Sequence, residues 1–404
     1  DNSMTTMSLI EEVYSNIKER KRNVETGKIN GIPFPLNGLK KYMPSIEKSS
    51  YWLFTGGSKS GKTQFMNFII LYNSILYAYQ NPDKISVRFI MFPLEEGKDM
   101  TLCRFMSYIL YTKYNVRISP TDIMSSNPDK PLSDGILSIM ESENFMQIIS
   151  FFESHIQFEE ANTSTGIDIV VKSYARQNGE TIYGDETFVD ENGNERKKII
   201  GYKPKDPKEY TFVFIDHANL IVPTKDEKTD LVAIQNLSKN LVKYYSKYGY
   251  ICVLAQQQQD NETNSMEAVK NDNILPTKAG LKGAKSPGQD ATVVLGISNP
   301  GSFQNLMTRY GYDLMKLKRK YLRICNIIFQ RFGEAEIIAP LYFDGAVNYY
   351  KDMPKPNDTE GMNKVYQSID QINSGSTNRF VFSMLFDRIF KKKKQWNYQP
   401  KEVR

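Results

Sequence analysis

Eight consecutive residues combine glycines with a lysine and a threonine at a spacing suited to holding phosphate groups. They are Gly56, Gly57, Ser58, Lys59, Ser60, Gly61, Lys62 and Thr63. Glycines let backbone N–H groups approach phosphate oxygens, the lysine ammonium reaches the β- and γ-phosphates, and the final hydroxyl ligates Mg²⁺. The segment therefore predicts a site for ATP and Mg²⁺, in which Lys62 also acts in catalysis and Thr63 is a metal ligand.

Two carboxylates stand at the ends of apolar segments that are typical of strands. Residues 210–215 are followed by Asp216, where a carboxylate can hold the water shell of the metal. Residues 89–94 are followed by Glu95, a suitable base for polarising an attacking water, and the adjacent Glu96 is a competing choice. These side chains predict a hydrolytic site with Asp216 as a metal ligand and Glu95 as the catalytic carboxylate.

A glutamine occupies the equivalent place at the end of another apolar segment. Gln256 follows residues 251–255, and its amide could sense the γ-phosphate. The alternative is that residues 256–259, all glutamines, form an ordinary polar loop.

Several strands and helices must position these groups. The predicted strands are residues 51–54, 87–92, 212–215, 251–255 and 291–297. A helical pattern over residues 64–79 follows the glycine-rich segment, which gives the order strand, loop and helix that a phosphate-binding loop requires. Helical patterns also lie between most of the other strands, so the sequence predicts an α/β fold with a mainly parallel sheet and crossover helices.

Three segments lie outside this pattern. Residues 8–25 predict an amphipathic helix, and Asn192-Gly193 predicts the turn of an inserted β-hairpin within residues 179–209. After residue 350 the chain becomes polar, and residues 373–378 predict a flexible link to a final basic helix. We therefore divide the chain into an N-terminal helix region (1–30), a body (31–350) and a C-terminal tail (351–404).

Composition excludes several classes of protein. The 404 residues are 40% hydrophobic and 24% charged, which is enough to bury a substantial core without disulfides. Three scattered cysteines and two histidines cannot assemble a zinc site. No run of eighteen apolar residues and no signal peptide is present, so we expect a cytoplasmic protein with no membrane segment.

The net charge of +6 is concentrated at one end of the chain. Residues 388–404 contain seven basic residues and one acidic residue, and these account for the whole formal charge. Because the remaining body is formally neutral, any contact with nucleic acid must come from locally placed cations.

The motifs, in this order, resemble those of the DnaB-like replicative helicases of bacteria and phages, which are RecA-like ring ATPases. Residues 93–96 resemble the family's Ser-Leu-Glu-Met, and residues 215–220 stand where the family has Ile-Asp-Tyr-Leu-Gln-Leu. Residues 31–39 look like the segment that leads from the family's linker helix into its ATPase domain. The resemblance implies a RecA-like P-loop fold with Glu95 as the catalytic carboxylate.

A loop near residue 285 also resembles the family. Residues 281–291 are similar to Leu-Arg-Glu-Ser-Gly-Ser-Ile-Glu-Gln-Asp-Ala, which in the family faces the central channel. By that resemblance, Lys282, Gly283 and Lys285 contact the phosphates of single-stranded DNA. The alternative is a solvated basic turn.

The segment 327–333 resembles a family strand ending Lys-Gln-Arg-Asn-Gly, whose arginine reaches the ATP of the neighbouring subunit. The resemblance implies that Arg331 is such a finger. Phe329 replaces the family's lysine, and Pro93 replaces its serine, so hydrolysis could be slower or another cation could substitute. The candidate substitutes are Lys318, Arg319 and Lys320.

Taken together, the resemblance implies an ATP-dependent DNA helicase of the phage type, a homo-hexameric ring that translocates on single-stranded DNA during replication. About fifty residues precede the phosphate loop, too few for the family's N-terminal collar domain, and the hairpin is not part of the usual pattern. The helix at 8–25 would dock on the adjacent subunit, and the basic tail would bind a replisome partner; each could instead pack on its own body. The competing functions are a recombinase-like or regulatory RecA-like ATPase that does not unwind DNA, and a nucleotide-binding structural ring.

Overall fold

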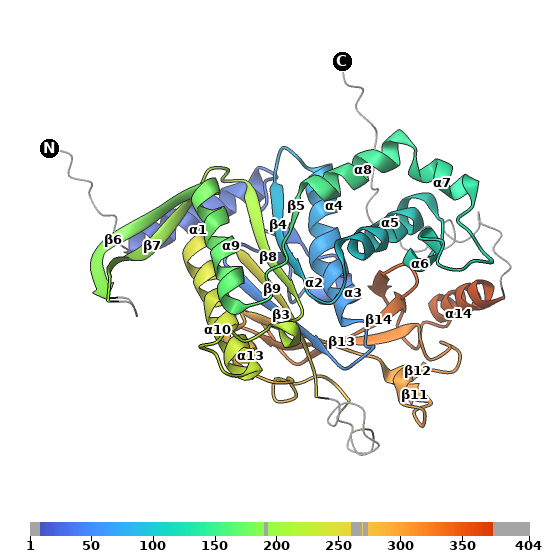
Figure 1. Ribbon diagram of the computed structural model, residues 1–404. Coiled ribbons are helices and arrows are strands. Elements are labelled where there is room, and N and C mark those ends of the chain that lie inside the picture. Colours follow the sequence, from blue (N-terminus) through green and yellow to red (C-terminus); the bar gives the residue numbers. More distant parts are fainter. Residues whose placement is uncertain (1–8, 190–192, 260–268, 270–273, 375–404) are drawn as a thin grey trace.

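A nine-stranded sheet forms the centre of the protein in the computed structural model, which describes residues 9–189, 193–259, 269 and 274–374. The strand order is β15-β14-β13-β10-β3-β9-β8-β4-β5 (Figure 1). The strands are β3 (Ser50–Gly56), β4 (Ser86–Pro93), β5 (Ile156–Phe158), β8 (Glu209–Asp216), β9 (Ile251–Gln257), β10 (Val293–Ser298), β13 (Leu322–Gln330), β14 (Ile337–Asp344) and β15 (Tyr349–Asp352). All five strands predicted from the sequence are present.

The sheet has a parallel and an antiparallel part. From β10 through β3, β9, β8 and β4 to β5, every pair is parallel, as the alternation of strands and helices predicted. Strands β13, β14 and β15 extend the sheet beyond β10 in antiparallel pairing. Strand β13 therefore begins at the edge of the sheet where β3 and β10 end, and it finishes at the opposite edge.

Helices cover both faces of the sheet, with α4, α5 and α8 on one side and α9 and α10 on the other (Figure 1). Side chains of β3 alternate between the two layers: Trp52 and Phe54 pack in one core, and Tyr51 and Leu53 in the other. The main helical segments are α3 (Lys62–Met66), η1 (Asn67–Tyr72), α4 (Asn73–Gln80), α5 (Lys98–Tyr114), α7 (Asp134–Met140), α8 (Glu143–Ser154), α9 (Ser164–Asn178), α10 (Asp230–Lys243) and α13 (Ser286–Asp290). None of the described helices is long and apolar enough to span a membrane.

The predicted hairpin is confirmed, and it projects from the body beside the central sheet (Figure 1). It consists of β6 (Gly179–Val189) and β7 (Glu195–Pro204), which form a separate two-stranded antiparallel sheet. Gly193 has φ +78°, a left-handed value typical of such a turn, and its neighbour Asn192 lies outside the described residues. Both strands lie within the predicted range of residues 179–209.

The N-terminal helix is confirmed as α1 (Leu9–Glu25), and it buries none of its residues. Its apolar stripe is exposed, with Leu9 at 74% and Tyr14 at 60%. An ion pair between Arg20 and Glu47, at 2.8 Å, ties the helix to the body. The stripe therefore does not pack on its own domain in this structure.

The boundary drawn at residue 350 does not match the structure, because it falls inside β15. The chain continues into α14 (Thr359–Asn373), whose Met362, Val365 and Ile369 are buried against the start of β13 and the end of β14. The composition of the chain after residue 350 is polar on average, and this average concealed the apolar residues on one side of α14. The predicted basic helix of the tail lies in residues 375–404, outside the described residues.

Candidate nucleotide-binding site

The glycine-rich segment forms a loop between the end of β3 and the start of α3. A side chain at Gly56 would bring its Cβ within 2.5 Å of the Ile297 carbonyl oxygen, so the close approach of β10 requires glycine there. Gly61 has φ +91°, and a Cβ there would lie 2.6 Å from the Tyr350 hydroxyl. The helical segment that begins at Lys62 continues to Gln80. This is the order of strand, loop and helix that the sequence predicted.

Lys62 and Asp216 face each other across the ends of two parallel strands. The distance from Lys62 Nζ to Asp216 Oδ1 is 3.7 Å, and both side chains are over nine-tenths buried. Asp216 Oδ1 has no hydrogen-bond donor in the described part of the chain. A buried carboxylate oxygen without a donor suits a hard cation such as Mg²⁺. The residues present therefore fit the predicted metal.

The two adjacent glutamates after β4 have different environments. The Arg104 guanidinium holds Glu96 by two hydrogen bonds, with Nε to Oε2 at 2.7 Å, and Arg104 also donates to Asn348. The side chain of Glu95 is 49% exposed, and among the described residues it forms no hydrogen bond with an arginine. Burial, followed by repulsion from Asp216, raises the pKa of Glu95. Glu96 is thus an anchor for α5, and Glu95 is the glutamate available to a water molecule.

A histidine that the sequence did not single out lies beside Glu95. The distance from His217 Nε2 to Glu95 Oε2 is 3.5 Å, and His217 follows Asp216 directly. Burial and the nearby Lys62 ammonium lower the pKa of His217 to about 4. The imidazole is therefore neutral at pH 7, so it contacts Glu95 as a dipole and not as a cation.

Gln256 is completely buried, and its amide already has partners. Its Nε2 donates to the carbonyl oxygens of Lys282, at 2.9 Å, and Ala284, at 2.8 Å, while its Oε1 has no hydrogen-bond partner among the described residues. The Asn219 amide also donates to the Lys282 carbonyl oxygen, at 3.0 Å. Gln256 thus connects the end of β9 to the loop that was predicted to bind DNA.

The cations of that loop differ in how they are held. Lys282 and Gly283 are exposed, and Gly283 has φ +81°. The Lys285 ammonium instead donates to the carbonyl oxygens of Leu281, at 2.5 Å, and Ala279. Lys285 therefore braces the loop in this structure, whereas Lys282 presents its ammonium to solvent.

Arg331 lies far from the phosphate loop of its own chain. Its backbone N–H donates to the Thr292 carbonyl oxygen, at 2.9 Å, just before the start of β10, and its side chain is exposed. The phosphate loop follows β3 and contacts the other end of β10, at Ile297. Arg331 and the loop therefore stand at opposite edges of the sheet.

None of the three suggested substitutes for the missing lysine is near Phe329. Lys318 pairs with Asp370, Arg319 donates to the carbonyl oxygens of the segment after β10, and Lys320 donates to Asn373. These residues precede β13, whereas Phe329 is near its end. The cation beside Phe329 is Lys278, whose Nζ lies 3.4 Å from the ring centroid. Repulsion from Arg331 contributes, after burial, to lowering the pKa of Lys278.

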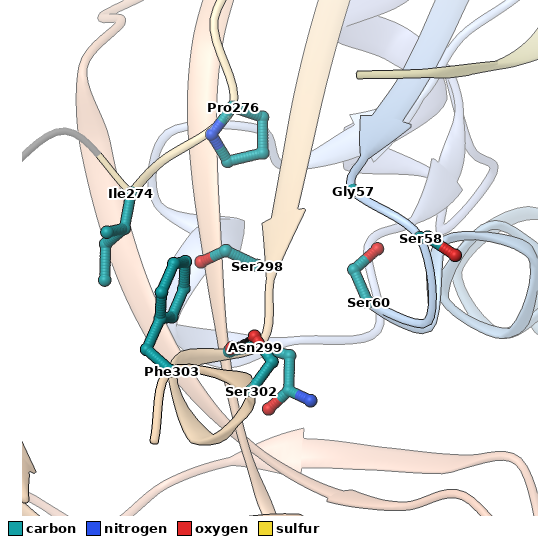
Figure 2. Close-up of a pocket in the computed structure, with 9 residues that line it drawn as sticks. All are labelled: Gly57, Ser58, Ser60, Ile274, Pro276, Ser298, Asn299, Ser302 and Phe303. Carbon is teal, nitrogen blue, oxygen red and sulfur yellow. Dashed lines mark hydrogen bonds between the residues drawn. The ribbon is translucent and has the colours of Figure 1, made fainter. Parts of the chain in front are cut away.

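A hollow opens beside the phosphate loop, where the segment after β10 approaches it (Figure 2). Its lining consists of Gly57, Ser58, Ser60, Ile274, Pro276, Ser298, Asn299, Ser302 and Phe303. The Ser60 hydroxyl is buried and has no hydrogen-bond partner among the described residues.

Comparison with solved structures identifies the fold. The chain is similar to a DnaB-like replicative helicase described with its interactions with primase, at a TM-score of 0.57 and 14% identity, over 87% of this chain and 68% of that one. It is also similar to a second solved structure, described as an ATPase domain, at a TM-score of 0.54 and 16% identity, over 86% of this chain and all of that one. Neither a protein-family model nor a curated protein sequence matches this chain. The predicted RecA-like α/β fold of the DnaB-like helicases is therefore confirmed at the level of structure.

Proposed function

We propose that this chain, which has the fold of the DnaB-like ATPase domains, hydrolyses ATP as part of a homo-hexameric ring that translocates on single-stranded DNA and unwinds duplex DNA. One observation carries the proposal: the groups suited to phosphoryl transfer lie at opposite ends of the strands of the central sheet. Lys62, Asp216 and Glu95 lie at one edge, and Arg331 lies at the other.

The separation follows from the direction of β13. Arg323, near the start of this strand, donates from Nε to the Ser60 carbonyl oxygen at 2.7 Å. Arg331 lies eight residues further along the extended chain, which at about 3.3 Å per residue places it roughly 25 Å away. An arginine side chain cannot cover that distance. Arg331 can therefore complete only a site that belongs to another subunit.

Charge neutralisation is the central chemical task of such a site. Lys62 of one subunit and Arg331 of the next would offset the negative charge that develops on the transferred phosphoryl group. Glu95, in its deprotonated form, would accept a hydrogen bond from the attacking water and orient it in line with the phosphorus. Thr63 and Asp216 would hold Mg²⁺, which supplies further charge neutralisation at the phosphate oxygens when it is bound.

The exposed stripe of α1 supports assembly through neighbouring copies. A helix with a single apolar face gains little stability alone, and burial of large side chains such as Leu9 and Ile10 would contribute about 1.5–3 kcal/mol each. Repeated head-to-tail docking of α1 on the next subunit would close a ring. The same arrangement would bring each Arg331 to a neighbouring phosphate loop.

Single-stranded DNA would contact the loop between β9 and β10. Lys282 presents an exposed ammonium there, with Gly283 beside it, and Lys285 holds the loop in shape. Contacts of this kind are made mainly to phosphates, so binding would be independent of sequence and sensitive to salt. Because Gln256 donates to the Lys282 carbonyl oxygen, a change of its partner towards the γ-phosphate would move this loop. The basic tail after residue 374 remains our proposed contact for a replisome partner.

Three measurements on the purified full chain test the proposal. Mass measurement with and without ATP and single-stranded DNA should show a hexamer, and ATP turnover should be stimulated by that DNA. Displacement of one strand from a forked duplex should require ATP. Turnover without strand displacement would favour a recombinase-like or regulatory ATPase, and an assembly that binds ATP without turnover would favour a structural ring.

A further inference from the structure

A buried arginine at the start of β13 contacts the phosphate loop from behind, that is, from the side of the antiparallel strands. Arg323 is only 5% exposed. Its Nε donates to the Ser60 carbonyl oxygen at 2.7 Å, and its Nη1 donates to Asn299 Oδ1 at 3.0 Å. Both partners line the hollow beside the loop (Figure 2). Nη1 also donates to the carbonyl oxygens of Lys320 and Leu322.

The charge of Arg323 is not matched by a carboxylate among the described residues. All four of its hydrogen-bond acceptors are neutral oxygens, and its guanidinium carbon lies 4.4 Å from the centroid of the Phe343 ring. Burial lowers the pKa of Arg323 to about 10, so the side chain is still a cation at pH 7. A buried cation without an anion is costly, and the cost falls when a negatively charged ligand binds nearby.

Tyr350 holds the next peptide unit of the loop in the same way. Its hydroxyl donates to the Gly61 carbonyl oxygen at 2.9 Å, and its ring packs against Phe343 at a centroid distance of 4.5 Å. Arg323 and Tyr350 thus bind two successive carbonyl oxygens, those of Ser60 and Gly61, from the side of the antiparallel strands.

The planarity of the peptide bond gives these contacts a consequence for the ligand. In a trans peptide the C=O group and the following N–H group point in opposite directions. Holding the Ser60 and Gly61 carbonyl oxygens from behind therefore aims the N–H groups of Gly61 and Lys62 away from Arg323 and Tyr350, towards the concave side of the loop. Those N–H groups are the ones that a phosphate-binding loop presents to its ligand.

We propose that Arg323 and Tyr350 are positioning residues that hold the phosphate loop in its ligand-binding shape, and that Arg323 adds an uncompensated positive charge which favours the polyphosphate of a nucleoside triphosphate. The proposal rests on the proposed nucleotide site at residues 56–63. It predicts that Arg323 and Tyr350, together called the clamp, contribute more to the affinity for the triphosphate than to the stability of the protein without nucleotide.

The test is equilibrium binding of a fluorescent ATP analogue with Mg²⁺ to the full chain, together with the thermal shift that ATP produces. Arg323→Met should weaken binding by about tenfold or more and reduce the thermal shift, because it removes a cation and its hydrogen bonds at nearly constant volume. Arg323→Lys, which keeps the charge, should restore part of the affinity.

Tyr350→Phe keeps the ring and removes only the hydroxyl, so it should weaken ATP binding by about three- to tenfold. The matched control is Tyr72→Phe, which removes a buried hydroxyl that has no hydrogen-bond partner among the described residues. That control should bind ATP as the wild type does. If Arg323→Met does not fold, the comparison of these two tyrosine variants decides the question.

Wild-type affinity in folded Arg323→Met and Tyr350→Phe would overturn the clamp. Failure of the nucleotide site itself gives a different result, because the unmodified protein would then bind no ATP or Lys62→Ala would bind it unchanged. A loss of affinity in Arg323→Met that is fully matched by a loss of stability without nucleotide would also count against a positioning role.

Discussion

Arg331→Ala should abolish ATP hydrolysis, and so should Lys62→Ala, yet a mixture of the two variants should recover part of it. The physical reason is the roughly 25 Å between Arg331 and the phosphate loop of the same chain, obtained from the length of β13 at about 3.3 Å per residue. Each ATP would therefore lie between the Lys62 of one subunit and the Arg331 of the next. The two defects belong to different subunits and can complement each other.

The size of the recovery can be worked out from the ring. In an equal mixture, each interface has about a one-in-four chance of joining an intact loop to an intact arginine, so about a quarter of wild-type turnover is the upper limit when interfaces act independently. An arginine finger is worth on the order of 10³ to 10⁵ in rate, so even a few repaired interfaces should exceed the background.

The assay is phosphate release at a fixed total concentration of subunits, across mixing ratios, with and without single-stranded DNA. Turnover should peak near equal mixing and fall to background at both ends. Arg196→Ala, which removes an exposed arginine on β7, serves as the control for loss of a surface cation and should leave turnover unchanged. If Arg331→Ala alone keeps full activity, the assignment of Arg331 as a finger is wrong. If the mixture is inactive in the absence of DNA as well as in its presence, independent action of the interfaces is excluded.

Four further predictions concern single sites. Lys62→Ala should remove turnover, and wild-type turnover would refute the site. Glu95→Gln should lower turnover by about 10² to 10⁴. Because burial raises the pKa of Glu95, turnover should begin to fall on acidification at a higher pH than it would with an ordinary carboxylate. A larger loss of turnover in Glu96→Gln would make Glu96 the catalytic carboxylate instead. Because burial lowers the pKa of His217 from 6.5 to about 4, the unfolded chain binds that proton more readily, so unfolding free energy should fall as the pH drops from 6.5 towards 4; an unchanged pH profile in His217→Gln would contradict this. Lys282→Ala should weaken binding of single-stranded DNA and reduce the slope of log affinity against log salt by about 0.7, and an unchanged slope would exclude a phosphate contact.

Local sequence patterns were sufficient for much of this protein. The glycine-rich segment, the apolar strands before Asp216 and Glu95, the helix at the N-terminus and the hairpin turn all depend on residues that are neighbours in the chain. Propensity, periodicity and turn chemistry act over such short distances, so these elements appear in the structure close to their predicted positions. The parallel order of the central strands followed from the helices between them.

Contacts between distant segments decided the rest. The sequence predicted Glu95 with Glu96 as a competing choice, but it could not show that Arg104 of α5 reaches back to hold Glu96, a contact that favours Glu95. It could not show that Lys285 is engaged by carbonyl oxygens of its own loop. Nor could it show that Arg323 contacts the phosphate loop, because Arg323, eight residues before Arg331, belongs to no recognisable motif.

The antiparallel strands explain why the sequence could not locate Arg323 and Arg331 relative to the phosphate loop. Whether β13 runs with or against β10 is set by long-range pairing, which leaves no local signal in the sequence. That one direction puts Arg323 against the phosphate loop and Arg331 at the far edge of the sheet. The sequence by itself therefore determined which side chains have chemistry suited to ATP, and the tertiary structure decided which of them lie near the phosphate loop of their own chain, because only the pairing of distant strands sets those distances.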